Sequence, residues 1–138
     1  MNCIDSFFGE FRFLSNFYPV VVLLDDVEYA SVEHAYQAAK TFDHKERDRI
    51  RCASSPSRAK HLSYSLLNKR LDWHEVNVDV MRGLLEQKFS VPELHDALIA
   101  TKGLELIEGN SWGDEYWGIC NGKGANMLGK LLMEIRDK

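Results

Sequence analysis

Three side chains that could take part in a reaction lie along one face of a predicted helix. They are the carboxylate of Glu33, the amide of Gln37 and the amine of Lys40. Their positions correspond to i, i+4 and i+7, which align along one side of an α-helix. Such a set can move protons, hydrogen-bond a ligand and attract an anion. Ordinary solvated helix faces show the same spacing and are common. Spacing alone therefore leaves both interpretations open.

A second group occupies residues 109–118 of a loop predicted over residues 109–124. Two tryptophans, a tyrosine and two acids alternate with glycines there. The rings of Trp112 and Trp117 are able to stack on a heterocyclic base, which contributes about 1 to 3 kcal/mol per base in nucleic-acid binders. Asp114 or Asn110 would then hydrogen-bond sugar hydroxyls. Alternatively, the tryptophans only close the core beneath the loop.

The segment Asn-Gly-Lys-Gly-Ala-Asn, residues 121–126, precedes the last predicted helix. Backbone N–H groups at a helix start attract anions, so this segment could cradle a phosphate. It lacks the GxxxxGK[ST] order of a Walker motif. A plain loop with Asn126 as the helix N-cap is the favoured alternative.

Cysteine and histidine usage argues against metal chemistry. Cys3, Cys52 and Cys120 are odd in number and widely spaced, so they form neither a CxxC pair nor a self-contained disulfide framework. The five histidines show no HExxH or HxH pattern. We expect no metal, and a reducing, cytoplasmic location.

Charge and hydropathy narrow the class of partner. The chain has 17 basic and 21 acidic residues in 138, interspersed along its length, so no broad basic face for duplex DNA or an anionic membrane is predicted. Any nucleic-acid contact should be local, at the rim of a pocket. No stretch approaches 18 apolar residues and the N-terminus lacks a signal-peptide pattern, so we expect no membrane span.

The elements that must position these groups follow from periodicity and capping. Residues 7–18 are aromatic-rich and predict short extended pieces joined by a turn. Residues 20–24 and 27–29 predict a hairpin across Asp25-Asp26. Ser31 is a suitable N-cap for a helix that extends to about Lys40 or Phe42 and carries the first group.

Further helices are predicted along the remainder of the chain, over residues 43–51, 56–68, 73–89, 90–101 and 126–136, with a short strand at 104–108. We find no internal repeat, linker or low-complexity segment that would divide the chain. The sequence predicts one compact domain over residues 1–138. Its fold class should be α+β, mainly α-helical, with a small N-terminal β element.

Four segments, in the same order along the chain, resemble the NADAR (YbiA-like) family. They are FLSNFYP at residues 13–19, SVEHAYQAAK at 31–40, DEYWG at 114–118 and NMLGKLLM at 126–133. Trp73 also matches a family position. The resemblance extends from about Phe7 to Arg136, and the combination of the first two segments is far more specific than any one of them.

The resemblance implies an N-glycosyl hydrolase that needs no cofactor. Two substrate classes are associated with the family: phosphoribosylamino-pyrimidine intermediates of riboflavin biosynthesis, and ADP-ribose attached to guanine in nucleic acid. Both join ribose C1 to a nitrogen and carry phosphate. The partner would thus be a phosphorylated ribosyl small molecule or ADP-ribosylated guanine, with no membrane partner.

The resemblance also implies roles for particular residues. Glu33 would stabilise an oxocarbenium-like transition state as an anion. Lys40 would either hold a phosphate or, as we prefer, attack C1 of the ring-opened ribose to form a Schiff base. The predicted substrate-binding residues are Ser15, Asn16, Gln37, Trp73, Asp114, Trp117 and Asn126.

Two non-catalytic alternatives use the same features. A nucleotide or ADP-ribose binding module would employ the aromatic and glycine-rich loops and bind ligand without forming product. A structural or regulatory protein would instead dock its tryptophans on a partner. The presence of both Glu33 and Lys40 favours the enzyme.

Overall fold

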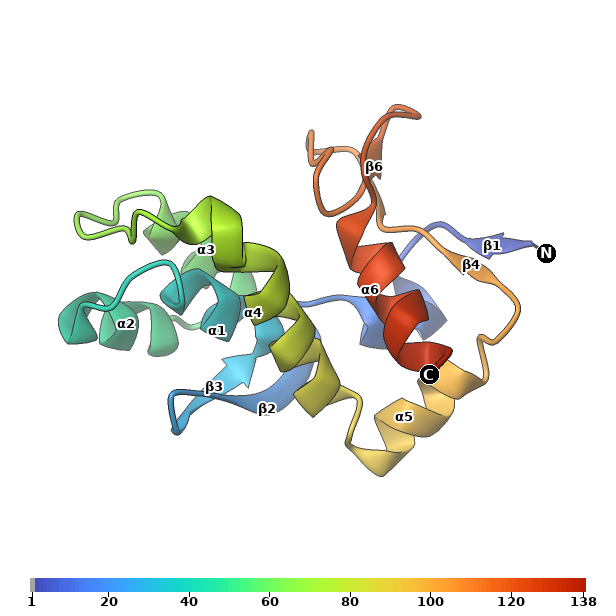
Figure 1. The fold of residues 1–138 in the computed structure, drawn as a ribbon, viewed down its shortest axis with the longest axis horizontal. Coiled ribbons are helices and arrows are strands. Elements are labelled where there is room, and N and C mark those ends of the chain that lie inside the picture. The colour runs from blue at the N-terminus through green and yellow to red at the C-terminus, as the bar shows by residue number, and fades with distance from the viewer. Residues whose placement is uncertain (1) are drawn as a thin grey trace. The chain divides into compact units, whose positions relative to one another are not determined.

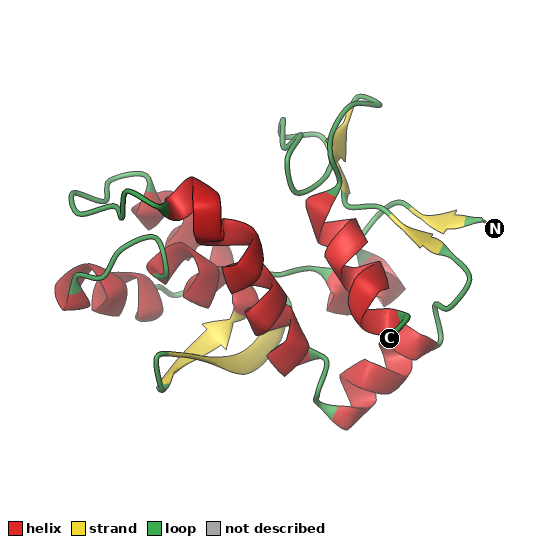
Figure 2. Ribbon diagram, viewed as in Figure 1, coloured by secondary structure: helices red, strands yellow, loops and turns green. Residues whose placement is uncertain are grey.

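The computed structural model describes residues 2–138 and has the predicted mainly helical α+β fold (Figure 1). Helices predominate over short strands (Figure 2). The elements, in chain order, are β1 (Cys3–Ile4), the 3-10 helix η1 (Gly9–Leu14), β2 (Pro19–Leu24), β3 (Val27–Ser31), α1 (Val32–Ala38), α2 (His44–Arg51), α3 (Pro56–Ser63), α4 (Trp73–Lys88), α5 (Pro92–Ile99), β4 (Glu105–Leu106), β5 (Gly109–Asn110), β6 (Ile119–Cys120) and α6 (Met127–Arg136).

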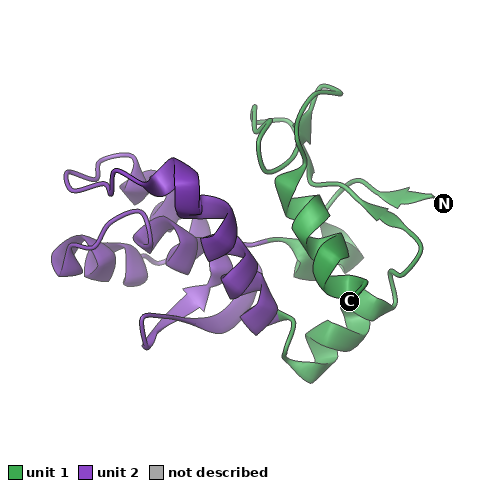
Figure 3. Ribbon diagram, in the orientation of Figure 1, with its two compact units in different colours: residues 1–15, 89–138 green, residues 16–88 purple. Residues whose placement is uncertain are grey.

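The chain divides into two compact units (Figure 3). Unit 1 comprises residues 1–15 and 89–138, and unit 2 comprises residues 16–88. Unit 2 contains the β2–β3 hairpin and helices α1 to α4, and unit 1 contains the remaining elements. Within residues 2–138, no helix combines the length and apolar composition needed to cross a bilayer.

The predicted hairpin of unit 2 is confirmed. Strands β2 and β3 pair antiparallel, with Leu24 opposite Val27 across the turn. Asp25 and Asp26 have φ angles of 49° and 66°, the left-handed pair that a two-residue type I′ turn requires. The hairpin leads directly into α1, because Ser31 ends β3 and caps the helix by accepting a hydrogen bond from the N–H of His34.

Helix α1 lies at the centre of unit 2, and α2, α3 and α4 all pack against it. Its seven residues are all buried, with Val32 and Ala35 fully enclosed. The helix ends at Ala38, earlier than predicted, because the N–H groups of Lys40 and Thr41 turn back onto carbonyls three residues earlier. Lys40 therefore lies in the turn after the helix.

The helix predicted over residues 56–68 is shorter in the structure and ends at Ser63. The buried carboxylate of Glu46 on α2 accepts hydrogen bonds from the backbone N–H groups of Leu67 and Asn68, at 2.7 and 3.2 Å. It also accepts one from the hydroxyl of Thr41, at 2.9 Å. These tertiary bonds give the backbone of the following loop a partner outside the helix, and the segment leaves the helical path.

The last residue of α4, Lys88, is fully buried at 0% exposure. Its ammonium lies 5.6 Å from the centroid of the Tyr18 ring, within cation–π range. Burial lowers the pKa of Lys88 to about 7 because a charged amine is poorly solvated in the interior. Lys88 is also the last residue of unit 2, so the unit ends on a buried amine.

The N-terminal segment of unit 1 differs from the prediction. Residues 9–14 form a 3-10 helix instead of extended pieces, with the Phe11 N–H bonded to the Phe8 carbonyl. Gly9 starts the turn at φ 61°, a conformation that glycine adopts easily. The helical turn buries Leu14 completely, so burial overrides the β preference of the aromatic residues.

Strand β1 of unit 1 was not predicted. It pairs parallel with β4, with Cys3 opposite Glu105 and Ile4 opposite Leu106. The strand predicted over residues 104–108 is confirmed but has only two residues, and the predicted loop 109–124 contains the paired strands β5 and β6. Such short parallel pairs leave almost no periodic signal in a sequence.

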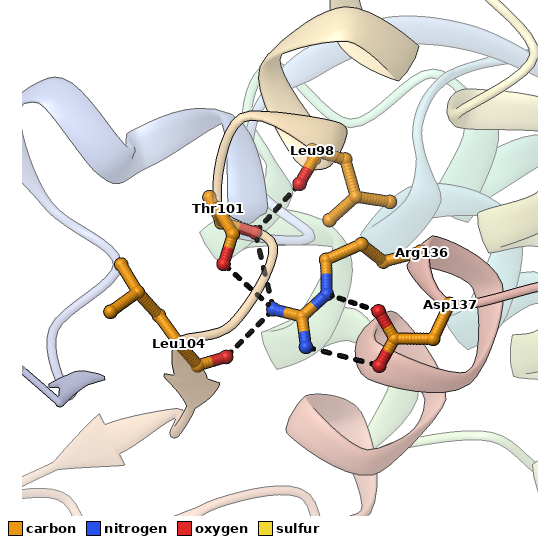
Figure 4. A network of polar contacts seen from close by, with 5 residues as sticks. All are labelled: Leu98, Thr101, Leu104, Arg136 and Asp137. Atoms are coloured by element: carbon orange, nitrogen blue, oxygen red, sulfur yellow. Dashed lines mark hydrogen bonds and ion pairs between the residues drawn. The ribbon is translucent and has the colours of Figure 1, made fainter.

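The C-terminal helix of unit 1 is tied to the end of α5 by Arg136 (Figure 4). Its guanidinium donates to the backbone carbonyls of Thr101 and Leu104, at 3.0 and 2.7 Å. It also forms two bonds with the carboxylate of Asp137. The hydroxyl of Thr101 in turn donates to the Leu98 carbonyl. The guanidinium and this hydroxyl thus supply hydrogen-bond donors to the backbone carbonyls at the end of α5 and just after it.

Candidate active site

Helix α1 holds Glu33 and Gln37 in the interior of unit 2, where they are only 7% and 4% exposed. The N–H of Glu33 donates to the backbone carbonyl of Asn16 at 3.1 Å. This bond joins the FLSNFYP and SVEHAYQAAK segments at the start of the helix. The solvated-face interpretation of these residues is therefore wrong.

The side chains of Glu33 and Gln37 are directly bonded. Nε2 of Gln37 donates to Oε2 of Glu33 at 2.6 Å, one helical turn away. The amide oxygen must then point away from the carboxylate. That oxygen is buried and, among the residues that the structure describes, has no hydrogen-bond donor.

Asn16 shows the same feature beside Glu33. Its side-chain nitrogen lies 3.6 Å from the sulfur of Met81, and its buried Oδ1 has no donor within residues 2–138. A buried acceptor without a partner costs about 1 to 3 kcal/mol, and such atoms are few in native proteins. Asn16 and Gln37 thus carry unused buried acceptors, one on the residue whose backbone carbonyl holds the N–H of Glu33 and one on the amide that holds its carboxylate.

Lys40 follows α1 and its amine lies 5.6 Å from the centroid of the Tyr36 ring. Burial lowers the pKa of Lys40 to about 8. The charge of Glu33 opposes this shift, while the positive charges of Lys69 and Lys60 add to it. Part of the amine is therefore neutral near pH 8 and able to act as a nucleophile.

Trp73 lies against the same helix. It is the first residue of α4, is buried, and its ring packs on Tyr36 with 5.0 Å between centroids. The Tyr36 ring thus lies against both Lys40 and Trp73, a role that the sequence did not indicate. The structure brings together five predicted residues within unit 2: Asn16, Glu33, Gln37, Lys40 and Trp73.

The other predicted site residues belong to unit 1, and Asp114 organises the aromatic loop there. Its Oδ1 accepts hydrogen bonds from the backbone N–H groups of Tyr116 and Trp117, at 3.0 and 2.9 Å. Asn110 holds the backbone of Asp114 through both ends of its amide. The ring of Trp117 is half-buried and meets Tyr116 edge to face, 5.0 Å between centroids.

Gly118 shows how tightly the loop is built. A Cβ added there would collide with the carboxylate and backbone carbonyl of Glu108 and with the amide of Asn110. Only glycine fits this position without displacing β5 and the residues beside it. Trp112, by contrast, is exposed and touches Phe8 edge to face.

Asn126 immediately precedes α6, as predicted, but its side chain makes no capping hydrogen bond. Instead its Oδ1 accepts from the N–H of Glu108 at 3.0 Å, and its Nδ2 donates to the carbonyl of Leu106 at 2.9 Å. The buried amide thereby ties the start of α6 to β4. Contact with a substrate hydroxyl stays a prediction for Asn126, as it does for Ser15, the half-buried residue before Asn16.

The segment between β6 and Asn126 forms a tight turn. Cys120 and Lys123 exchange backbone hydrogen bonds at 2.9 and 3.1 Å, with Asn121 and Gly122 in left-handed conformations. This geometry agrees with the plain-loop interpretation. Across residues 2–138, no group of three or more His, Cys, Asp or Glu side chains is placed to hold a metal ion.

The chain is similar to a family of known proteins and to individual members of it. The sequence matches the NADAR domain family over residues 6–138. It is 39% identical over 134 residues to an N-glycosidase, YbiA, of Shigella boydii, covering 95% of this chain and 81% of the relative. It is 36% identical over 130 residues to a riboflavin biosynthesis protein of Vibrio vulnificus, covering 91% of this chain and 35% of that protein.

The fold agrees with that of a solved relative. The NMR structure of the Escherichia coli protein YbiA superposes with a TM-score of 0.85 at 36% identity, covering 99% of this chain and 84% of that one. The relatives named as N-glycosidases class the chain as an enzyme, an N-glycosyl hydrolase. The chain belongs to the NADAR family.

Proposed function

We propose that this enzyme hydrolyses the bond between ribose C1 and a base nitrogen in a phosphorylated, nucleotide-like substrate. The observation that carries the proposal is the buried Glu33 carboxylate, oriented by Gln37 and followed by Lys40, whose pKa is lowered to about 8. Cleavage of a ribosyl C1–N bond develops positive charge on the sugar, which an adjacent carboxylate stabilises.

Lys40 provides the covalent route that we prefer. When the sugar ring opens, the neutral amine of Lys40 adds to C1. The base then leaves with the nitrogen that held C1 protonated, and a C=N bond forms between C1 and Lys40. Water then hydrolyses the C=N bond between C1 and Lys40, which releases the free sugar and restores the amine. Atoms balance as substrate plus one water giving base plus ribosyl product.

The remaining assignments extend this proposal to the other predicted residues. Asn16 and Gln37 offer acceptors to hydroxyl or amino groups, and Trp73 supplies an aromatic wall. We propose substrate contacts for Ser15, Asp114, Trp117 and Asn126 as well. Residues 1–138 are proposed to act as one NADAR domain, because the family match extends through both units.

The substrate is proposed to be either a ribosylaminopyrimidine phosphate of riboflavin biosynthesis or ADP-ribose on guanine in nucleic acid. The first is supported by the name of the Vibrio vulnificus relative. The second would need only a local nucleic-acid contact, consistent with the chain's modest net charge of -4. A cytoplasmic, reducing location is also proposed, since Cys3, Cys52 and Cys120 are all free thiols.

The test is mass spectrometry of products after incubating the purified enzyme with each substrate, beside Glu33→Gln. Free ADP-ribose from a guanine-ADP-ribosylated oligonucleotide would identify a nucleic-acid de-ADP-ribosylase. Ribose 5-phosphate from the aminopyrimidine riboside phosphate would identify a metabolite glycosidase. Binding of both without cleavage would contradict the proposal and favour a binding module.

A further inference from the structure

A second lysine is held beside Lys40 by the backbone. The N–H of Arg70 donates to the carbonyl of Lys40 at 2.7 Å, and Thr41 and Lys69 form an isolated antiparallel bridge. The loop between α3 and α4 therefore adds one strand-like contact to the turn after α1. This pairing fixes the backbone of Lys69, an exposed residue, next to the turn that carries the predicted nucleophile.

A third lysine approaches from α3, which packs on α1. Lys60 is half-buried on that helix. Both Lys60 and Lys69 lie near enough to Lys40 for their charges to lower its pKa, although burial is the larger cause. Three amines from α3, from the turn after α1 and from the loop before α4 thus share one region of unit 2.

The acidic groups facing this region are mostly engaged elsewhere. Asp72 forms a two-fold ion pair with Arg70, and Glu46 is occupied by Thr41 and the N–H groups of the loop. Glu33, which attracts Lys40, is bonded to Gln37. Within the part of the chain that the structure describes, Lys60 and Lys69 form no ion pair with an acidic residue.

Several arginines of the same unit behave differently. Arg47, Arg70 and Arg82 each pair with an aspartate, at 2.6, 2.6 and 2.8 Å. Lysine amines that repel one another without a counter-ion lower stability unless an anion joins them. Because the loop backbone is held by Glu46 and by the Lys40 carbonyl, this arrangement is in place before any ligand binds.

We propose that Lys60 and Lys69 form the phosphate-binding subsite of the enzyme, which leaves Lys40 for the chemistry at C1. The ligand group is a phosphate monoester or a diphosphate attached to the ribose. A dianion placed between the two ammonium groups would balance their positive charges and favour the protonated form of each lysine. This inference rests on the proposed function, since it places the sugar of that substrate between Glu33 and the two lysines.

The variants Lys60→Met and Lys69→Met test the subsite by comparing a phosphorylated ribosyl substrate with its dephosphorylated counterpart. For the phosphorylated substrate, each should raise KM about tenfold, the effect expected from losing a charged hydrogen bond, with kcat nearly unchanged. KM for the dephosphorylated riboside should stay the same. Lys45→Met on α2, which removes an exposed lysine charge of the same unit, as Lys69→Met does, is the matched control.

Two phosphate sources are separated by the choice of substrate. If the subsite takes a terminal phosphate, the variants weaken turnover of the riboside 5-phosphate. If it takes the diphosphate of ADP-ribose, they weaken turnover of the modified oligonucleotide. A KM effect of the same size on the dephosphorylated riboside, or no effect on either phosphorylated substrate, would overturn the proposal.

A binding measurement separates this inference from the proposed function. Titration of pyrophosphate should shift the amide NMR signals of residues near Lys40 in the wild type and in Lys45→Met. The Lys60→Met/Lys69→Met double variant should show no such shifts. If the wild type cleaves no substrate yet shows these shifts, the hydrolase proposal fails and the anion subsite stands; equal shifts in the double variant would disprove the subsite.

Discussion

Gln37 donates a 2.6 Å hydrogen bond from Nε2 to Oε2 of Glu33, and both side chains are buried on α1. The bond orients the carboxylate while the opposite side of the amide presents an oxygen that has no donor within the described chain. A ligand hydroxyl or amino group would satisfy that oxygen. The pair therefore links the catalytic candidate to the proposed substrate contact of Gln37 through a single side chain.

Glu33→Gln should fold normally and lose activity by several powers of ten, because the amide keeps the shape but cannot carry the negative charge. The Gln37 amide can still donate to the oxygen of the new side chain. Thermal unfolding checks the fold and single-turnover kinetics check the activity. Retained turnover would eliminate Glu33 as the essential carboxylate.

Gln37→Met should lower kcat about ten- to a hundredfold, since the carboxylate loses the donor that orients it. The unfolding free energy should change by less than about 1 kcal/mol, because the variant also removes a buried acceptor without a partner. Steady-state kinetics and chemical denaturation measure the two effects. A large loss of stability with unchanged kcat would indicate a purely structural role.

The pH dependence of turnover should distinguish the two roles of Lys40. Its pKa of about 8 means that the neutral amine becomes predominant above that pH. If Lys40 is the nucleophile, kcat/KM should rise with pH and level off above about 8. If Lys40 instead binds phosphate as a cation, kcat/KM should fall over the same range.

Chemical trapping provides the companion test for Lys40. Borohydride should reduce the C=N bond and leave a sugar attached to Lys40, detectable by peptide mass spectrometry. Lys40→Arg keeps the charge but should show neither turnover nor adduct. Near-normal activity of this arginine variant would support the phosphate-ligand role instead.

Glu46→Gln should destabilise unit 2 by about 1 to 3 kcal/mol at pH 7, because an amide nitrogen would replace an acceptor of the loop N–H groups. Burial opposes ionisation of Glu46, but the hydrogen bonds from Leu67, Thr41 and Asn68 outweigh it and lower its pKa. A lowered native pKa stabilises the protein above the unfolded value of about 4.3 and ceases to do so as pH falls through the native pKa. The wild-type advantage in urea denaturation should thus shrink in acid.

Lys88→Met should raise the melting temperature at pH 7, because burial lowers the pKa of Lys88 and so opposes the charged form that the unfolded chain carries at that pH. The native pKa of about 7 lies below the unfolded value of about 10.4, so the unfolded state binds more protons between them. Wild-type stability should therefore rise with pH over this interval, and the gap to the variant should narrow. A gap that does not change with pH would show that packing, not charge, sets the difference.

Local signals in the sequence predicted much of the helical framework. Ser31 caps α1 as predicted, and Asp43 and Ser55 cap α2 and α3 through the same kind of side-chain bond to a backbone N–H. Capping and periodicity depend on residues within a turn or two, so a sequence displays them directly. The alignment of Glu33 with Gln37 has the same origin, since a four-residue interval suffices to place them together.

Contacts between distant segments could not be predicted in this way. Nothing local indicates that the carbonyl of Asn16 meets the N–H of Glu33, or that Lys69 is held beside Lys40. The parallel β1–β4 pair and the ties of Asn126 to β4 likewise depend on chain segments far apart in sequence. Such pairings are decided by packing of the whole unit.

The sequence by itself thus determined a mainly helical α+β chain, one helical face carrying a carboxylate and an amide, and membership of a glycosidase family. Only the tertiary structure decided that this face is buried, that the pKa of Lys40 falls to about 8, and that Lys60 and Lys69 lie near it. The physical reason is that burial and electrostatic environment are properties of everything packed around a group, whereas helix geometry is a property of its neighbours along the chain.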